Sequence, residues 1–586
     1  MKPFLTAFTL LSLLSATSQA ASPDLDQLQQ HGEGLLQQRE QNLQELSRLI
    51  QPPVDVREDT PQVPRQWILN TTEKPCFPIH EVILVGQKSD QFHFALRSAV
   101  RKTKFESNMC LGTEAINTLM EAAQNAIVEA GYSTTRVLAG EQNLKEGQLK
   151  LTVIPGRIRH ITYNQENAEE THIGRIMAWG NQFPMREGDI LNVHDLEQAL
   201  ENLRRNPTVE ADFQIVPAGD GEEGESDIVV SWRQRLIPFR LALSLDDSGS
   251  KYTGKNQLGV TFASDNPLGL SDLFYFNFSH DLGHKTRLTD SDGHRTRGGT
   301  HGYAIHYSVP FGNRLFTVEH QRYTYHQAIA GLQENYDYSG ESQLFNLSVS
   351  QLLHRNATGK TYAKLGFWTR ETESFINDAP IDIQYRRTAG WLFALTHQER
   401  LGRAIFDTTL QYKRGTGANR SLRTPEEDFG EGTSRMQLLR WDASLSVPFQ
   451  IFQQALSFQT SFHAQYNLTP LMIQDQLSIG GRNTVRGFDG DVNLMAERGW
   501  YWQNTLAWQY ANAHQLYLGV DAGRIMGSEV QYQLGQTLVG AVLGIRGQWS
   551  FAGDLYYDFF VGRALKKPEF FQTAENTLGF STTWTF

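Results

Sequence analysis

The second half of the chain alternates between two kinds of side chain. From residue 237 to residue 586, apolar residues alternate with polar or small ones at a period of two, as in Phe239 to Asp246 and Trp441 to Phe449. Neighbouring side chains of a β-strand point to opposite faces, so this period predicts strands with one apolar and one polar face. About sixteen such segments follow one another, separated by turns rich in Gly, Asn and Asp.

A soluble β-sandwich also alternates, but three features favour a membrane barrel. No helical pattern interrupts the region, and its polar face carries many Arg, Asp, Gln and Ser residues suited to a wet lumen. The 33 Phe, 20 Tyr and 11 Trp are concentrated here and cluster near strand ends, as aromatic girdles do. Closure also leaves the last strand without an unpaired edge. We predict a transmembrane β-barrel of about sixteen antiparallel strands over residues 236–586.

The N-terminus has the pattern of an export signal. Lys2 precedes the apolar run Phe4 to Leu14, and the small residues Ser18 and Ala20 flank Gln19 at a cleavage site. Residues 1–20 are therefore predicted to be a signal peptide. After Ala20 no stretch approaches eighteen apolar residues, so the mature chain is either soluble or enters a membrane through strands.

The sequence predicts a helix over residues 21–50 and a linker over residues 51–75. Leucines at spacings of three, four and seven predict an amphipathic helix over Asp24 to Ile50, which Gly32 and Gly34 weaken. Its polar face is mainly Gln, and two interpretations stay open: a helix packed on a neighbour or in a coiled coil, or a removable plug in a polar pore. Gln51 to Pro75 holds five prolines and could span roughly 75 Å as an extended linker.

The sequence predicts two successive α/β repeats, over residues 76–155 and 156–235. The first contains a strand at Val82 to Gly86 and a helix at Thr113 to Ala130, and the second a helix capped by Asn192. Each unit follows the order strand, helix, helix, strand, strand. Cys76 and Cys110 are the only cysteines, and an isolated pair in an exported protein predicts one disulfide, which would join the opening strand of the first repeat to the segment before its long helix.

Composition and motifs disfavour two function classes. The net charge of −11 provides no basic stripe for a nucleic acid. The sequence contains no GxSxG, HExxH, Walker or CxxC motif, so we expect no enzyme, no metal and no cofactor. A barrel hydrolase would need an acid, a base and a nucleophile together at the barrel mouth, and the sequence offers no such group.

One loop stands out, between strands expected near Met472 to Ile479 and Tyr501 to Tyr510. Its sequence Gly480 to Gly490 contains Val485-Arg486-Gly487-Phe488, which resembles the VRG-aromatic signature of the Omp85 superfamily. The order of signal peptide, helix, Pro-rich linker, two POTRA-like repeats and C-terminal barrel resembles the two-partner secretion transporters, the TpsB branch. Within that branch the chain looks most like the haemolysin and contact-dependent inhibition transporters.

The resemblance implies a lumenal partner for the loop arginine. In the family this loop folds into the barrel, and its Arg pairs with an Asp in an aromatic-x-Asp-x-Gly strand motif. The matching stretch here keeps Asp521 and Gly523 but has Gly519 in place of the aromatic residue. The period of two independently points Asp521 into the lumen, because it shares a strand face with Gln515 and Tyr517. A buried Arg486 needs such a carboxylate.

The resemblance also implies a function. A two-partner secretion transporter of the Gram-negative outer membrane, with its N-terminal region in the periplasm, would recognise a large unfolded TpsA-like exoprotein and pass it through its barrel without ATP. The client would be an adhesin, a haemolysin or a contact-dependent inhibition toxin. Strand addition to a repeat would capture the client. Further expected partners are outer-membrane lipid and the barrel assembly machinery, through the last strand, which ends at Phe586. The alternative is an assembly factor that inserts barrel proteins, although such factors generally carry more repeats and no N-terminal helix.

Overall fold

The computed structural model describes residues 25–52, 54–57, 67–164, 180–219, 224–283, 285–289, 293, 295–331 and 334–586. The expected signal peptide and the middle of the linker lie outside these ranges. So does 165–179, the stretch that would hold the first helix of the second repeat.

The C-terminal part of the described chain is a closed antiparallel barrel, with sixteen long strands and the two-residue strand β16 (Ala379–Pro380). The expected strand number and closure are confirmed. The long strands, in chain order, are β9 (Phe239–Asp246), β10 (Gln257–Asp265), β11 (Leu273–Asp281), β12 (Gly299–Phe311), β13 (Arg314–Ala330), β14 (Asn335–Arg355), β15 (Gly359–Ile376), β17 (Arg386–Leu401), β18 (Ala404–Thr416), β19 (Gln437–Ile451), β20 (Gln454–Asn467), β23 (Arg498–Ala511), β24 (His514–Met526), β25 (Thr537–Ser550), β26 (Asp554–Lys566) and β27 (Thr577–Thr585).

The barrel wall has the two faces that its period of two predicts. Along β24 the side chains of Leu516, Leu518 and Val520 are exposed on the outside, whereas those of Tyr517 and Asp521, which alternate with them, are buried on the inside. Apolar residues facing outward suit contact with lipid chains. No helix among the described residues is long and apolar enough to cross a membrane.

The barrel closes by pairing its first strand with its last. β27 pairs with β9 over five residue pairs, from Ser581–Asp246 to Thr585–Ala242, and the main chains of Phe586 and Leu241 exchange two further hydrogen bonds. By comparison, β26 and β27 share nine pairs, and β9 and β10 share eight. The closing seam is therefore held by fewer ladder bonds than the contacts beside it.

The two repeats share one topology, which confirms their prediction as repeated units. In each three-stranded sheet the first strand lies parallel to the last, which lies in the middle and pairs antiparallel with the remaining strand. The elements of the first repeat are β1 (Phe77–Ile79), β2 (Glu81–Gly86), α2 (His93–Thr103), β3 (Met109–Leu111), α3 (Thr113–Glu129), β4 (Arg136–Leu138) and β5 (Gln148–Ile154). Those of the second are β6 (Arg157–Tyr163), α4 (Val193–Arg204), β7 (Val209–Pro217) and β8 (Glu225–Gln234).

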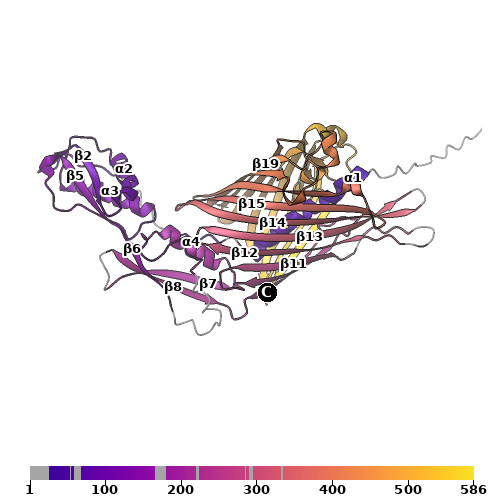
Figure 1. Cartoon of the computed structure of the whole chain (residues 1–586), viewed down its shortest axis with the longest axis horizontal. Helices are drawn as coiled ribbons and strands as arrows, with labels where there is room; N and C mark the ends of the chain where they lie inside the picture. Colours follow the sequence, from indigo (N-terminus) through magenta and orange to yellow (C-terminus); the bar gives the residue numbers. More distant parts are fainter. Residues whose placement is uncertain are drawn as a thin grey trace, which may run out of the picture.

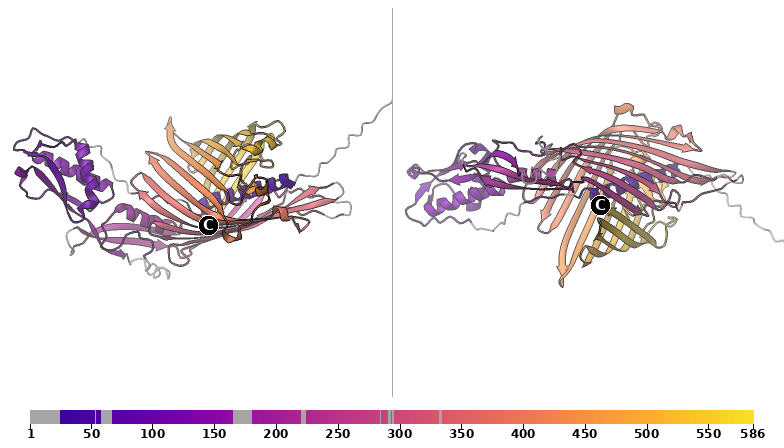
Figure 2. Two further views of the ribbon diagram at one scale, coloured as in Figure 1. Left: turned by 45° about the horizontal axis from the view of Figure 1, so that its top comes forward. Right: turned by 90° about the horizontal axis from the view of Figure 1, so that it is seen from below.

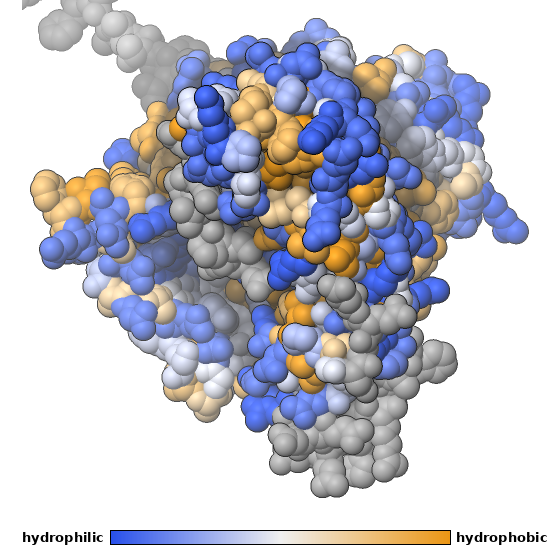
Figure 3. Space-filling view, turned by 90° about the vertical axis from the view of Figure 1, so that its left-hand side faces the viewer, coloured by the Kyte–Doolittle hydropathy of each residue, from blue (hydrophilic) through white to orange (hydrophobic). Residues whose placement is uncertain are grey.

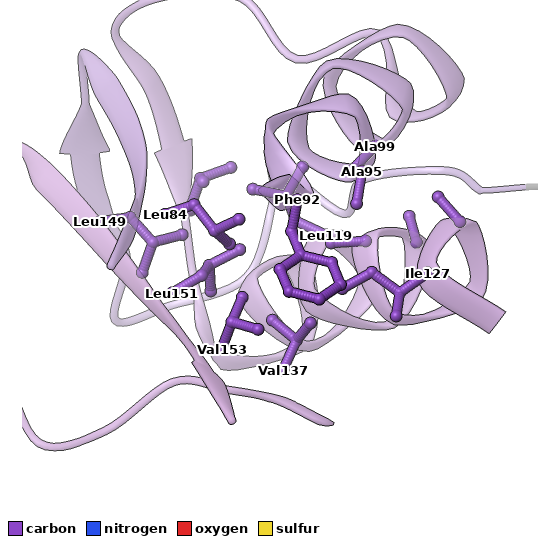
Figure 4. Packing of buried hydrophobic residues seen from close by; sticks show 14 of the residues in the cluster. Leu84, Phe92, Ala95, Ala99, Leu119, Ile127, Val137, Leu149, Leu151 and Val153 are labelled. Carbon is purple, nitrogen blue, oxygen red and sulfur yellow. The ribbon is translucent and has the colours of Figure 1, made fainter. Parts of the chain in front are cut away.

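Each repeat has its own apolar core. In the first, Phe92 lies between Leu119 and Ile127 of α3 and the sheet residues Val137 and Val153 (Figure 4). The surface at this end of the molecule is largely hydrophilic with scattered hydrophobic patches (Figure 3). In the second repeat the Asn192 side chain accepts a hydrogen bond from the His194 N–H at 2.9 Å, which confirms the predicted cap of α4.

The predicted disulfide is present. Cys76 precedes β1 and Cys110 lies in β3, the strand that leads into the long helix α3, and their Cα atoms are 5.4 Å apart. The bond reinforces the β1–β3 pair, in which Pro78 lies opposite Cys110.

The N-terminal helix α1 (Leu25–Ile50) lies inside the barrel rather than beside it (Figures 1 and 2). Near one end, Leu28 and Leu36 pack against Tyr323, Tyr325 and Tyr338 of the wall. At the other end, Leu46 and Ile50 pack against Ala263, Leu273 and Tyr275. Barrel residues thus cover the apolar face of α1 near both of its ends.

Gly32 and Gly34 explain how the helix fits. A Cβ on Gly32 would lie 2.0 Å from the Tyr325 hydroxyl, and one on Gly34 would lie 2.7 Å from Asn493 Nδ2. Glycine costs about 1 kcal/mol of helix propensity at such positions. Here its lack of a side chain allows the helix to approach the wall and the loop closely.

Short elements complete the described chain: the 3₁₀ helices η1 (Ser89–Phe92), η2 (Leu144–Glu146), η5 (Asp382–Gln384), η6 (Ala418–Arg420), η7 (Pro425–Asp428), η8 (Ile473–Asp475) and η9 (Ser528–Tyr532), and the strands β21 (Leu477–Ile479) and β22 (Leu494–Ala496).

Candidate functional site

The loop between β20 and β23 folds into the barrel. The strand expected near Met472 to Ile479 is wrong in extent, because the structure has η8 there and then the three-residue β21, which pairs with β22 and not with the wall. The apolar residues that suggested a wall strand are buried within the loop's own cluster: Leu477 and Ile479 pack with Leu494 and Ile525. Burial by a folded loop and burial in a wall leave similar sequence patterns.

Arg486 and Asp521 form the contact that the sequence predicted. Arg486 Nε donates to Asp521 Oδ2 at 2.7 Å, and Nη2 donates to Oδ1 at 2.8 Å, so the pair is bidentate. The Arg486 main-chain N–H also donates to Oδ2 at 2.9 Å. Nη2 also donates to two groups of the wall strand β23, Thr505 Oγ1 at 2.9 Å and the Asn504 carbonyl at 3.2 Å. The Asp521 side chain is 0% exposed and that of Arg486 15% exposed, so the charges are largely removed from water and satisfy each other.

Glycines in the wall make room for the motif. A Cβ on Gly540 of β25 would lie 1.9 Å from the Arg486 carbonyl oxygen, and one on Gly562 of β26 would lie 2.8 Å from the Gly487 Cα. Gly487 itself has a φ of +104°, which an L side chain rarely adopts. The loop backbone therefore lies directly on the strands.

The structure explains why this chain has Gly519 where the family motif has an aromatic residue. A Cβ there would lie 2.7 Å from Arg486 Nη2, so the guanidinium lies over the bare backbone of β24. Gly523 likewise leaves room for Val485. A Cβ on Gly523 would lie 2.8 Å from Val485 Cγ2. A larger residue at Gly519 would require the guanidinium to shift.

The two apolar residues of the motif anchor the loop. Val485 and Phe488 are 0% and 1% exposed. Phe488 meets Phe571 edge-to-face with ring centroids 5.7 Å apart, and both belong to one cluster with Leu538 of β25. The motif thus combines one charged contact with an apolar anchor on each side of it.

A second charged contact in this loop was missed by the sequence analysis. Arg482 Nη1 donates to Asp247 Oδ1 at 3.0 Å and to the Phe580 carbonyl at 3.1 Å, and its guanidinium lies over the Phe560 ring. Asp247 Oδ1 in turn accepts the Phe580 N–H at 2.9 Å. Since Asp247 follows β9 and Phe580 belongs to β27, Arg482 bridges the closing seam. The only signal was an Arg in a Gly-rich loop, which names no partner.

The helix α1 contacts this loop and the wall through polar groups. Asn483 Nδ2 donates to Asn42 Oδ1 at 2.7 Å, and Gln37 Nε2 donates to the Gln476 carbonyl at 2.8 Å. Further contacts are a buried ion pair of Glu33 with Arg370 of β15 at 3.0 Å and a hydrogen bond from Arg39 Nη2 to Asn277 Oδ1 of β11 at 2.7 Å. Helix and loop therefore occupy the lumen as one hydrogen-bonded unit.

The fold and this loop define a class: an outer-membrane β-barrel transporter with periplasmic POTRA domains. Residues 224–547 match the family described as haemolysin secretion/activation protein ShlB/FhaC/HecB. Residues 77–156 match the ShlB-type POTRA domain, and residues 157–217 match a POTRA domain. The matched ranges cover both repeats and most of the barrel.

Individual relatives agree with this class. The outer membrane transporter CdiB-2 of Burkholderia pseudomallei is 33% identical over 566 residues, 94% of this chain and 93% of the relative. The hemolysin transporter protein HpmB of Proteus mirabilis is 22% identical over 78% of this chain and 77% of its own. The structure of CdiB from Acinetobacter baumannii superimposes with a TM-score of 0.79 at 26% identity, covering 95% of this chain and 99% of that one.

The chain belongs to the haemolysin secretion/activation family of two-partner secretion transporters. The expected resemblance, fold class and location are confirmed: it is an outer-membrane transporter whose N-terminal region lies in the periplasm.

Proposed function

We propose that this chain secretes one large exoprotein of the contact-dependent inhibition type through its barrel, and that α1 is the plug that closes the barrel at rest. The proposal is supported by the polar helix that fills the lumen and is continuous with a Pro-rich linker. The similarity to transporters named CdiB supports the type of client.

The linker length fits a removable plug. In the proposed organisation, residues 21–50 are the plug and 51–75 its tether, 76–155 and 156–235 are the POTRA domains, and 236–586 are the barrel. A tether of about 25 residues reaching roughly 75 Å lets the helix leave the lumen without moving the first POTRA domain. Besides the apolar contacts at its two ends, the plug is held by hydrogen bonds and an ion pair, which water in the lumen can replace.

The direction of transport follows from the compartment. The periplasm contains no ATP, so the driving force would have to come from the client itself. The client would arrive unfolded, be captured by strand addition at a POTRA sheet edge, and fold outside, which prevents its return. The proposal takes outer-membrane lipid as the partner of the exposed apolar wall, and the assembly machinery as the partner of β27 with its terminal Phe586.

In this proposal Arg486 and Asp521 hold the loop in the position that a working transporter needs. The pair fixes the loop backbone against β24 to β26, so that the lumen beside it can be cleared by moving α1 alone. A loop released from the wall would obstruct the path of the client. The pair thus acts on transport by positioning and makes no covalent chemistry.

Deletion of residues 21–50 tests the plug. Removing a helix of about 10–12 Å diameter from the lumen should raise single-channel conductance in a planar bilayer several-fold. The matched control is Q44A, which keeps the helix and changes one of its exposed side chains. Equal conductance of the deleted and intact proteins would show that α1 does not occlude the pore.

Co-expression with a large candidate exoprotein of the contact-dependent inhibition type tests the transport function. Client should appear in the medium only when this chain is present. An assembly factor would instead change the membrane level of many barrel proteins and leave the exoprotein inside. That second outcome would contradict the proposal and support the alternative.

A further inference from the structure

Residues 54–57 of the linker are bound where the second POTRA domain meets the barrel. The Val56 N–H donates to Glu201 Oε1 of α4 at 3.0 Å. The Val56 carbonyl accepts a hydrogen bond from Arg355 Nη2 at the end of β14. One side chain from each domain therefore recognises the main chain of a single linker residue, as a peptide-binding site does.

The residues on either side of this contact are also held. Asp55 forms ion pairs with Lys360 at 2.5 Å and with Arg400 at 2.6 Å. Burial alone would raise the Asp55 pKa, but hydrogen bonds from Lys360 and Arg57 bring it down to about 2, so the carboxylate is charged at any physiological pH. Arg57 Nη1 donates to the Ala357 carbonyl at 3.0 Å. The Val56 side chain packs against the apolar core of the second POTRA domain.

The receiving groups are organised by the two domains themselves. We name Glu197, Glu201, Arg355 and Lys360 the junction cleft. Arg355 Nε donates to Glu197 at 3.0 Å, and Lys360 is hydrogen-bonded to Glu201. The side chains of Arg355, Glu197 and Lys360 are each only 3% exposed. The contacts among these four side chains do not themselves involve the linker.

Space for a longer or bulkier chain adjoins the junction cleft. A cavity of about 380 Å³ lies between Gln51, Pro52 and Val54 of the linker, α4, and the barrel residues Tyr362 and Thr396. The linker thus forms one wall of this cavity. If the linker leaves with the plug, the cavity and the site at Val56 join.

We propose that the junction cleft is a binding site for an extended polypeptide, which the linker occupies at rest and a segment of the client occupies during secretion. The inference rests on the proposed function, since it supposes that a client passes this point. Glu201 and Arg355 bind main-chain atoms, so the site would accept segments of many different sequences. The flanking contacts favour a segment with an acidic residue followed by an apolar one, as in Asp55-Val56.

Site-specific photo-crosslinking during secretion tests the proposal. A photoreactive residue replaces Tyr362, which lines the cavity, in a full-length chain whose client is stalled by a folded C-terminal fusion. It should crosslink to the linker when no client is present and to the client when it is stalled. The matched control replaces Phe452, which is 94% exposed in the turn between β19 and β20 and should crosslink to neither.

A third position separates this inference from the function itself. Tyr323 packs against α1 in the lumen, so a photoreactive residue there should meet any client inside the barrel. Client crosslinked at Tyr323 but never at Tyr362 would overturn the inference and leave the function standing. Failure to secrete any exoprotein would overturn both.

The side-chain contacts of the linker have a test of their own. In the double variant D55A/R57A the tethered linker should dock weakly, and client crosslinking at Tyr362 should rise several-fold. The matched control R423A/D428A removes the same charges from an exposed extracellular pair. The control should leave crosslinking unchanged, and an equal rise in both variants would overturn the role of the linker contacts.

A synthetic peptide probes the same site without transport. A fluorescent peptide of the sequence 51–60 should bind to detergent-solubilised D55A/R57A protein, and N-methylation of its valine at position 56 removes only the donor to Glu201. A hydrogen bond to a charged group makes binding about tenfold stronger or more, so the methylated peptide should bind at least about tenfold more weakly. Equal binding of the two peptides would overturn recognition through the main chain.

Discussion

Removing either partner of the Arg486–Asp521 pair should strongly lower secretion while the barrel still inserts. In R486A the carboxylate of Asp521, which is 0% exposed, loses donors at 2.7 and 2.8 Å and keeps the main-chain N–H at 2.9 Å. Breaking a buried ion pair costs about 3–5 kcal/mol when the remaining charge stays dry. Since Arg486 is 15% exposed, lumen water reaches the site and the lower end of this range applies.

The loss of this ion pair should destabilise the docked position of the loop more than the barrel wall. The wall strands keep their ladder bonds in R486A, whereas the loop loses its charged contact and retains the apolar anchors Val485 and Phe488. About 3 kcal/mol shifts the ratio of docked to released loop by roughly a hundredfold. We therefore expect secretion to fall at least about tenfold at an unchanged level of folded barrel.

The assay compares R486A, D521A and the double variant. Secreted client is quantified from the medium, and heat-modifiable mobility of the barrel in gels measures its folded level. Because the two residues act as one unit, the double variant should be little worse than either single variant. Normal secretion by both single variants at normal membrane levels would refute the reasoning, and additive losses would show that the residues act separately.

Three further predictions follow from single contacts. C76S opens a loop with a sequence separation of 34 and should destabilise the first POTRA domain by about 3–4 kcal/mol, seen as faster hydrogen exchange of its buried amides; unchanged exchange would contradict this. G540V places side-chain atoms where the Arg486 carbonyl lies, so it should displace the loop and make it easier for a protease to cleave. G140V should not change cleavage, because the space around Gly140 is open. R482A removes the bridge between β9 and β27 and should lower the temperature at which the barrel unfolds in gels; an unchanged transition would show that the seam does not depend on it.

Much of the fold could be predicted because its signals are local. The period of two decided which face of β24 carries Asp521, since neighbouring residues of a strand must point to opposite sides. The spacing of apolar residues located α3 in the same way. The cysteine pair followed from the count of two in a chain with an export signal.

The partners of polar groups could not be predicted from local patterns. The Gln-rich face of α1 suits a coiled coil or a wet lumen equally, and only the wall residues Tyr325 and Arg370 distinguish them. Arg482 gave no sign of Asp247, 235 residues earlier in the chain. The segment from Met472 to Ile479 resembled a wall strand because a loop that folds inward also buries every apolar residue it can.

The sequence by itself determined the alternating barrel wall, the two repeats, the disulfide and the motif pair, because each depends on spacing along the chain or on the resemblance of a short motif. Only the tertiary structure decided that α1 fills the lumen, that Arg482 bridges the seam, and that Val56 is held by Glu201 and Arg355. These contacts join residues more than a hundred positions apart. Their partners are selected by the closure of the barrel around them, which brings together groups that no local pattern relates.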